Sequence, residues 1–167
     1  FLSNDRDIYM PIDDSVVKVI DNEEFLIRPG RGYRPLYLNL KCNTKIVALG
    51  SEMKNTIAIT KNSNVILSEY IGDIKNIKTL ENFNDVFNHF SKIYNVNPKI
   101  IVKDKHPNFF YNDLNFDNNI NVLKTQHHHC HIASCILENE INEKVIGIAF
   151  DGTGYGDAGR IWGGEFY

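Results

Sequence analysis

The chain has 167 residues, of which 43% are hydrophobic and 23% are charged, and its formal net charge is −3 at pH 7. These values are ordinary for globular proteins and exclude a disordered chain, and the length suggests one domain with a fragment of another. The acidic balance argues against a nucleic-acid surface that works by electrostatic attraction. The three cysteines (Cys42, Cys130 and Cys135) are too few and too scattered for a disulfide framework, which favours a reducing compartment.

The first residues lack the pattern of a signal peptide, and no apolar run approaches the roughly 18 residues that a membrane span needs. We therefore expect a soluble, cytoplasmic protein without a membrane partner. The chain opens without Met and stops inside an expected strand, so we expect it to be a piece of something longer.

The first 40 residues are expected to be rich in strand. Apolar runs at 16–20 and 25–28, separated by a polar turn, predict a hairpin. The loop that follows, 28–35, is basic and contains Gly and Pro. Its arginines and a serine upstream carry groups that bind phosphate oxygens, although a solvated basic loop is the simpler reading of the composition. These residues are Ser15, Arg28, Arg31 and Arg34. Residues 37–45 are expected to form a linker.

From residue 45 the pattern changes to short strands and amphipathic helices. Strands are expected at 46–49, 56–59 and 65–68, followed by a helix over 79–95 with an aromatic stripe. A strand at 99–103, a short helix within 108–118, a strand at 120–124, a helix at 127–140 and a strand at 145–150 complete the order. In the turn after the strand expected at 46–49, Lys54 and Asn55 could reach a nucleotide. An ordinary hairpin turn accounts for these two residues equally well.

Three strands in a meander, followed by helices alternating with strands, indicate the fold class. This order predicts an α/β protein with a mixed sheet, of the kind found in one lobe of actin-like ATPases (a ribonuclease-H-like lobe). The segments 46–51 and 148–153 are weakly similar, and each opens a hairpin. Proteins of this class bind nucleotide between two lobes, so the chain is expected to contain one lobe and the first hairpin of the next.

The densest metal-ligand chemistry lies in the run Gln126-His127-His128-His129-Cys130-His131. On a helix, His127 and His131 are four residues apart and project from one face within reach of one cation. The alternatives are a solvated polar cap or buried, hydrogen-bonded histidines. His128 and His129 point elsewhere on the helix.

A second anchor, Asp151-Gly152-Thr153-Gly154-Tyr155-Gly156-Asp157, follows the apolar run 145–150. A strand that delivers a carboxylate into a Gly-rich turn predicts a third ligand in Asp151 and a phosphate cradle in the turn. Asp before Gly is also a common turn former, so that alternative stays open.

These stretches together resemble the HypF carbamoyltransferase family of [NiFe]-hydrogenase maturation over nearly the whole chain. The motifs that carry the resemblance are 13–17 (DDSVV), 31–35 (RGYRP), 48–56 (ALGSEMKNT), 70–74 (YIGDI), 104–107 (DKHP), 126–131 (QHHHCH), 151–157 (DGTGYGD) and 162–165 (WGGE). By resemblance, residues 1–40 form the C-terminal part of a YrdC-like domain and 45–167 the N-terminal part of a Kae1-like domain.

The resemblance implies a chemistry. The family activates carbamoyl phosphate with ATP and Mg²⁺ as carbamoyl-adenylate, and the carbamoyl group passes to the C-terminal cysteine of HypE for synthesis of the cyanide ligand. A thiolate can attack the carbamoyl carbon of the adenylate because AMP is a good leaving group. Ser15, Arg28 and Arg31 would hold the adenylate or pyrophosphate, and His127, His131 and Asp151 an iron or zinc ion that touches the phosphates. Gly152, Thr153 and Gly154 would offer backbone N–H groups.

The chain departs from the family pattern at Tyr9 and Pro11, where His and Arg are usual, and at Cys130, where Ala is usual. The first two departures put full YrdC-type activity in doubt. Two other readings stay open: a Kae1-type tRNA threonylcarbamoyl-transfer protein, and a remnant that binds metal or nucleotide without turnover. The first is disfavoured by the 151–153 motif and by the acidic charge.

Overall fold

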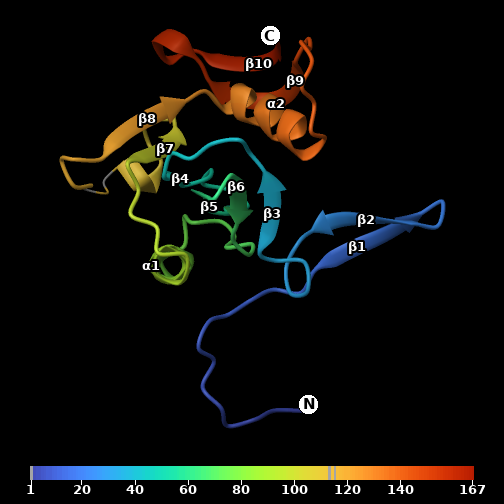
Figure 1. Cartoon of the computed structure of the whole chain (residues 1–167), viewed down its shortest axis with the longest axis vertical. Coiled ribbons are helices and arrows are strands. Elements are labelled where there is room, and N and C mark those ends of the chain that lie inside the picture. Colours follow the sequence, from blue (N-terminus) through green and yellow to red (C-terminus); the bar gives the residue numbers. More distant parts are fainter. Residues whose placement is uncertain (1, 113, 115) are drawn as a thin grey trace.

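The computed structural model describes residues 2–112, 114 and 116–167. Figure 1 shows a central sheet between two helices, with a separate two-stranded hairpin at either end of the chain. The elements follow in the order β1 (Val16–Ile20), β2 (Glu23–Arg28), β3 (Leu36–Asn39), β4 (Ile46–Ala48), β5 (Ala58–Lys61), β6 (Asn64–Leu67), α1 (Ile77–Ile93), β7 (Ile100–Asp104), η1 (Phe110–Asn112), β8 (Asn121–Thr125), α2 (His127–Glu138), β9 (Ile148–Tyr155), η2 (Asp157–Gly159) and β10 (Ile161–Phe166).

The central sheet has six strands in the order β3-β6-β5-β4-β7-β8. Its strands β3, β6, β5 and β4 pair antiparallel, whereas β4, β7 and β8 run parallel to one another. A meander that continues into parallel strands through a helical crossover is the topology expected from the sequence. The parallel strands all end at one edge of the sheet, which is where ligands bind in open α/β sheets.

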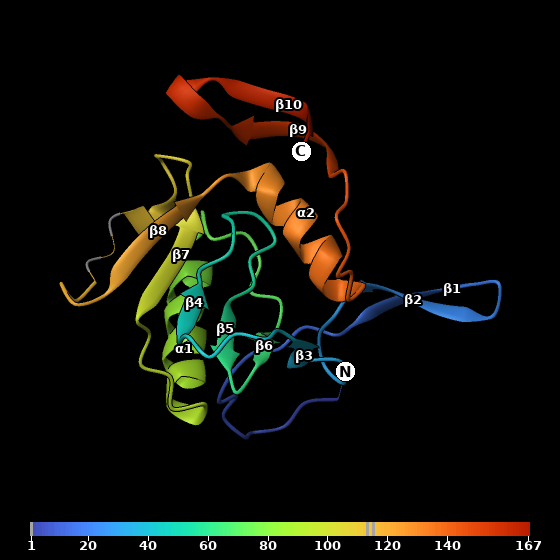
Figure 2. The same ribbon diagram turned by 45° about the horizontal axis from the view of Figure 1, so that its top comes forward.

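Helix α1 covers one face of the sheet, and the hydrophobic core lies between them (Figure 2). Its buried residues Phe83, Val86 and Phe90 are spaced three and four apart, as a helix that packs on one side requires. The helix starts at Asn76, whose side chain accepts a hydrogen bond from the Lys78 N–H at 2.9 Å. The expected helix over 79–95 is therefore present, shifted by two residues.

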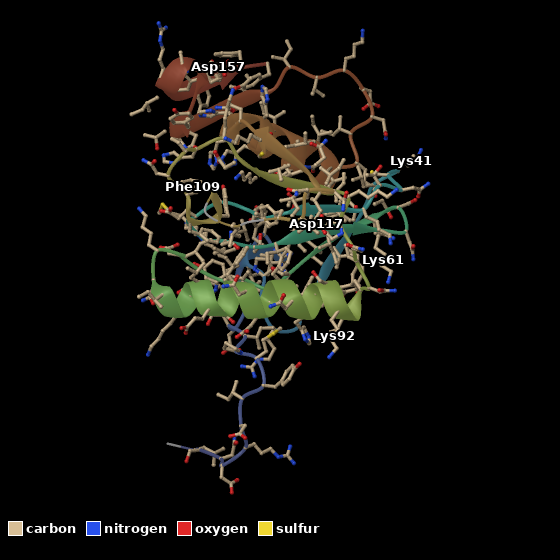
Figure 3. The ribbon with its side chains drawn as sticks, turned by 90° about the vertical axis from the view of Figure 1, so that its left-hand side faces the viewer. Lys41, Lys61, Lys92, Phe109, Asp117 and Asp157 are labelled. Carbon is tan, nitrogen blue, oxygen red and sulfur yellow. The ribbon has the colours of Figure 1, made fainter. Side chains whose placement is uncertain are left out.

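The sheet contributes alternating side chains to this core. Val47 of β4, Ile59 of β5 and Ile101 of β7 are almost fully buried in it. Because side chains alternate along a strand, the neighbours Ala48, Ala58 and Val102 face the opposite side of the sheet, where α2 lies. Figure 3 shows α1 beneath the sheet. The N-terminal segment of the chain extends away from the rest of the molecule below this helix.

The prediction of a linker at 37–45 is wrong for its first residues, because Leu36–Asn39 form strand β3. This strand pairs with β6 from Leu36↔Leu67 to Asn39↔Asn64 at the edge of the central sheet. Its exposure alternates, with Leu36 and Leu38 half-buried and Tyr37 and Asn39 exposed. The two leucines pack while the polar positions face solvent, which is the pattern of an edge strand.

The prediction of a Gly-rich turn after residue 150 is also wrong. Strand β9 starts at Ile148, later than expected, and runs through Gly152 and Gly154 to Tyr155, paired with β10. Glycine inside a strand often marks a close approach of another group. A side chain at Gly154 would lie 2.3 Å from Cε1 of His128, so glycine lets the strand pass against the helix.

The short helix expected within 108–118 is reduced to η1, and residues 113 and 115 lie outside the described part of the chain. Among the residues that the structure describes, the helices are all too short or too polar to cross a membrane.

Candidate metal centre

The start of α2 places the histidine run at the edge of the sheet where the parallel strands end. β7 and β8 pair in parallel up to Asp104↔Thr125, and α2 begins two residues later. Gln126 caps the helix, and its side-chain oxygen accepts the N–H of His129 at 3.1 Å. The cap fixes the first turn of α2 and with it the directions of His127 and His131.

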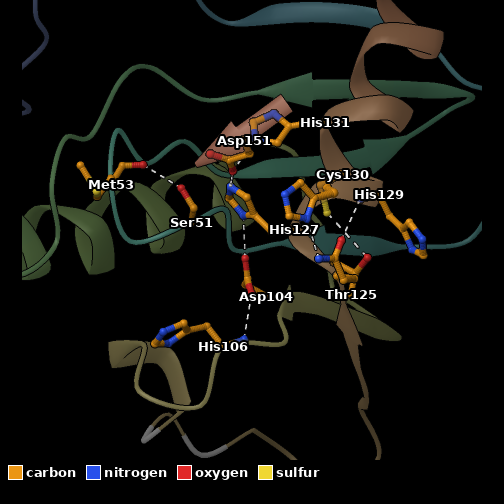
Figure 4. A network of polar contacts seen from close by, with 12 residues as sticks. Ser51, Met53, Asp104, His106, Thr125, His127, His129, Cys130, His131 and Asp151 are labelled. Carbon is orange, nitrogen blue, oxygen red and sulfur yellow. Dashed lines mark hydrogen bonds and ion pairs between the residues drawn. The ribbon is translucent and has the colours of Figure 1, made fainter. Parts of the chain in front are cut away.

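Three predicted ligands meet at this point (Figure 4). One ligand atom from each of His127, His131 and Asp151 lies within 4.8 Å of the other two. Nε2 of His127 lies 3.2 Å, and Nε2 of His131 3.5 Å, from Oδ2 of Asp151. The helix supplies the two imidazoles and β9 the carboxylate. Two histidines and one carboxylate on one side of an ion are a ligand set for zinc or for non-haem iron, with positions left open for substrate.

Asp104, which ends β7, was not predicted as part of the site. Its Oδ2 lies 2.9 Å from Nδ1 of His127, and its Oδ1 accepts the N–H of His106 at 2.8 Å. The signals in the sequence were its place directly after the expected strand at 99–103 and in the motif 104–107. Only the strand register shows that the two side chains meet.

The charges of the cluster shift its pKa values. The hydrogen bond to Asp104 raises the pKa of His127, against the opposing effect of burial, and the charges of Asp104 and Asp151 add to the rise. Partial burial raises the pKa of Asp151, but the backbone amides of Gly152 and Thr153 and the two histidines outweigh it and hold that pKa below its usual value. The arrangement favours an ionised carboxylate facing the imidazoles.

A cavity of about 360 Å³ lies next to these ligands, between α2 and the sheet. Its floor is formed by small side chains of β4 and β5, Ala48 and Ala58, which leave room between the sheet and the helix. The other lining residues are Gly50, Ser51, Thr56, Val102, Lys103, Asp104, Thr125, His127, Cys130, His131 and Ser134. The cavity therefore joins the histidines to the turn that follows β4.

In that turn, Gly50 and Ser51 line the cavity, whereas the predicted residues Lys54 and Asn55 do not. Gly50 has a φ of +74°, and a side chain there would collide with the carbonyl oxygen of Thr56 at 2.3 Å. Asn55 is fully buried, and its amide donates to the carbonyl oxygens of Leu49 and Ser51. The Asn55 side chain thus holds the turn together, and its contact with a nucleotide stays a prediction.

Of the three predicted phosphate-binding residues in β9, Gly152 and Thr153 are exposed beside Asp151 and Gly154 is buried. Gly154 lies against His128, whose ring is fully buried and whose Nδ1 accepts a hydrogen bond from Nε2 of Gln126 at 2.8 Å. His128 thus supports the packing of α2 on β9. The ring of His129 contacts Tyr167, with centroids 4.3 Å apart.

Ser15 lies directly before the first hairpin, Arg28 ends it and Arg31 follows it, and none of the three lines the cavity. The Ser15 hydroxyl accepts the Gly30 N–H at 2.7 Å and donates to the Arg31 carbonyl oxygen at 3.0 Å. Arg31 pairs with the carboxylate of Asp14, and Arg28 donates to the backbone oxygen of the same residue at 3.2 Å. In this structure the three residues therefore hold the loop together, apart from the metal cluster.

Comparison with known proteins assigns the chain to a family. Residues 41–138 match the family model described as the HypF Kae1-like domain, and the chain belongs to this family. The expected fold class is thereby confirmed.

The chain is 40% identical over 169 residues to the carbamoyltransferase HypF of Synechocystis sp., covering 99% of this chain and 22% of that protein. It is 33% identical over 172 residues to the probable carbamoyltransferase HypF of Methanocaldococcus jannaschii, again covering 99% of this chain and 22% of the relative. The chain thus spans about a fifth of the length of these relatives.

Two solved structures are similar over most of the chain. Full-length HypF in a phosphate- and nucleotide-bound form superimposes with a TM-score of 0.87 at 39% identity, covering 99% of this chain and 27% of that one. HypF of T. kodakarensis superimposes with a TM-score of 0.78 at 37% identity, over 92% of this chain and 21% of that one.

Proposed function

We propose that the chain forms the metal-binding half-site of a HypF-type carbamoyltransferase that serves [NiFe]-hydrogenase maturation. The observation that carries the proposal is the convergence of His127, His131 and Asp151 beside a cavity in a HypF Kae1-like fold. The same three residues were expected from spacing and resemblance.

The residues fit a divalent iron or zinc ion. Zn–N and Zn–O bonds are about 2.0–2.2 Å long, so ligands of one ion lie up to about 4 Å apart, close to the span of the cluster. His127, His131 and Asp151 would hold the ion, and its positive charge would attract phosphate oxygens of a nucleotide. We place such a phosphate between the exposed backbone at Gly152 and Thr153 and the cavity-lining residue Ser51.

The reaction proposed is transfer of a carbamoyl group activated by ATP. Hydrolysis of carbamoyl phosphate would release phosphate and carbamate, and attack of the carbamate on the α-phosphorus of ATP, with Mg²⁺, would release pyrophosphate and give carbamoyl-adenylate. The C-terminal cysteine thiolate of a HypE-type partner would then attack the carbamoyl carbon, with AMP as leaving group. Binding of phosphate and nucleotide by the full-length HypF structure supports this substrate class.

The division of the chain into a YrdC-like part at 1–40 and a Kae1-like part from 45 stays a prediction. Strand β3 pairs with the central sheet, so the change from the first hairpin to that sheet falls before Leu36. We place Ser15, Arg28 and Arg31 with the adenylate-forming part, and Lys54 near the nucleotide. We also propose a cytoplasmic location, where HypE-type partners and ATP are available.

A chimera tests the function. In the Synechocystis relative, the segment matched by this chain is replaced with residues 1–167, and carbamoylation of a HypE-type cysteine from carbamoyl phosphate and ATP is followed by mass spectrometry. We expect transfer by the chimera, and none when it carries His127→Ala and His131→Ala. We also expect none from the chain alone, which matches only 22% of that relative. Transfer by the doubly substituted chimera, or by the chain alone, would contradict the proposal.

A further inference from the structure

Asp104 is a nearly enclosed carboxylate at the end of a central strand. Its side chain is only 8% exposed, beside a His127 side chain that is 27% exposed. A carboxylate is rarely buried unless its oxygens accept hydrogen bonds. Among the described residues, the His106 N–H donates to Oδ1 and the His127 ring contacts Oδ2.

The register of two neighbouring strands brings Asp104 next to His127. β7 and β8 run parallel with Asp104 beside Thr125, and only the cap residue Gln126 separates Thr125 from the start of α2 at His127. The Asp104 main chain is held as well, because its N–H donates to the hydroxyl of the fully buried Tyr111 at 3.1 Å. The carboxylate is thus mounted on a rigid element, while His127 stands on the first turn of a helix.

The two nitrogens of the His127 ring face different partners. Nδ1 lies 2.9 Å from Asp104, and Nε2 lies 3.2 Å from Asp151. Both carboxylates only accept hydrogen bonds, but Asp104 is the closer partner and, at 8% against 30% exposure, the more enclosed one, so in the neutral ring the proton belongs on Nδ1 and the lone pair on Nε2. That lone pair points at the place where the three proposed metal ligands converge.

We propose that Asp104 is the positioning residue of the metal site: it holds the His127 ring in the orientation and tautomer that present Nε2 to the ion. The inference rests on the proposed metal centre and adds a residue outside its ligand set. Partners of this kind raise the basicity of a ligating imidazole, and their loss costs about 10–100-fold in metal affinity.

A purely structural role makes a different prediction. As a turn former, Asp104 would matter only through Oδ1 and the His106 N–H. Asp104→Asn and Asp104→Ser both keep an oxygen that can accept this N–H, but neither keeps the carboxylate that accepts from His127. The two roles are therefore separable by substitution.

The test is a titration of the purified metal-free protein with Co²⁺, followed by visible absorption at one fixed pH, with Zn²⁺ as competitor. We expect both Asp104 variants to bind about 10–100-fold more weakly than the wild type. The matched control is Asp117→Asn, which makes the same charge change in an exposed turn where the side chain accepts the Asn119 N–H at 3.0 Å. It should bind like the wild type.

A second readout does not depend on how well the variants fold. Long-range ¹H–¹⁵N spectra of the metal-free wild type report which nitrogen of His127 carries the proton. With the ring neutral we expect the proton on Nδ1, and a neutral ring that carries its proton on Nε2 overturns the proposal. Folded Asp104 variants with wild-type Co²⁺ affinity overturn it too, while leaving the metal site intact. Failure of the wild type to bind Co²⁺ would instead remove the metal site, and the role of Asp104 with it.

Discussion

Single residues decide how closely α2 and β9 approach each other. Gly154 packs against the buried ring of His128, and a side chain added there would lie 2.3 Å from its Cε1. At Gly152, two residues earlier in the same strand, nothing lies within 4 Å of an added side chain. The absence of a side chain at Gly154 therefore lets the strand that carries Asp151 approach the helix that carries the proposed histidine ligands.

Gly154→Ala should destabilise the protein. The added methyl cannot fit without moving His128 or the strand, and overpacking of this kind costs about 1–3 kcal/mol. Thermal unfolding followed by circular dichroism measures the loss. Gly152→Ala is the matched control and should change the free energy of unfolding by less than about 0.5 kcal/mol, as is usual for surface substitutions. Equal stability of the two variants would show that β9 and α2 are not packed as described.

At the scale of single residues, the proposed metal ligands were predictable from the sequence, whereas the residues that hold them in place were not. The spacing of His127 and His131 depends only on helix geometry, so the sequence alone indicates that the two side chains share a face. Asp104 is 23 residues from His127, and only the parallel register of β7 and β8 brings them together. In the same way, the turn after β4 was expected near the nucleotide, but its curvature presents Ser51 to the cavity and turns Asn55 inward.

At the scale of elements, long periodic segments were predictable and short or interrupted ones were not. The aromatic stripe of α1 gives the helix correctly, because a one-sided apolar pattern of 17 residues has few alternatives. β3 has only four residues after a proline, so its alternation was too brief to stand out. β9 contains two glycines that usually mark turns, and pairing with β10 keeps them in a strand.

The N-cap of α1 provides a test at this scale. Asn76→Ala removes the side-chain oxygen that accepts the Lys78 N–H and should cost about 0.5–2 kcal/mol of stability. Asn76→Asp keeps an acceptor at the cap and adds a charge that the helix N-terminus favours, so its stability should equal or exceed that of the wild type. Urea unfolding of the three proteins gives the comparison. A stable Ala variant would mean that α1 begins elsewhere.

At the scale of the whole molecule, apolar side chains stay exposed on both peripheral hairpins. In β1–β2, Val19 is 66% and Phe25 62% exposed, and in β9–β10, Phe150 is 83% and Phe166 68% exposed. Two-stranded hairpins are rarely stable alone in water. The chain spans about a fifth of its HypF relatives, so these faces are consistent with a half-site that works as part of a larger protein.

The central claim is that the two histidines and Asp151 hold one metal ion. Elemental analysis of the purified protein measures it directly, comparing the wild type with a His127→Ala, His131→Ala double variant. His89→Ala, on α1 and outside the cluster, is the matched control. We predict stoichiometric iron or zinc in the wild type and the control, and loss of that metal from the double variant. The same metal content in all three proteins would contradict the account.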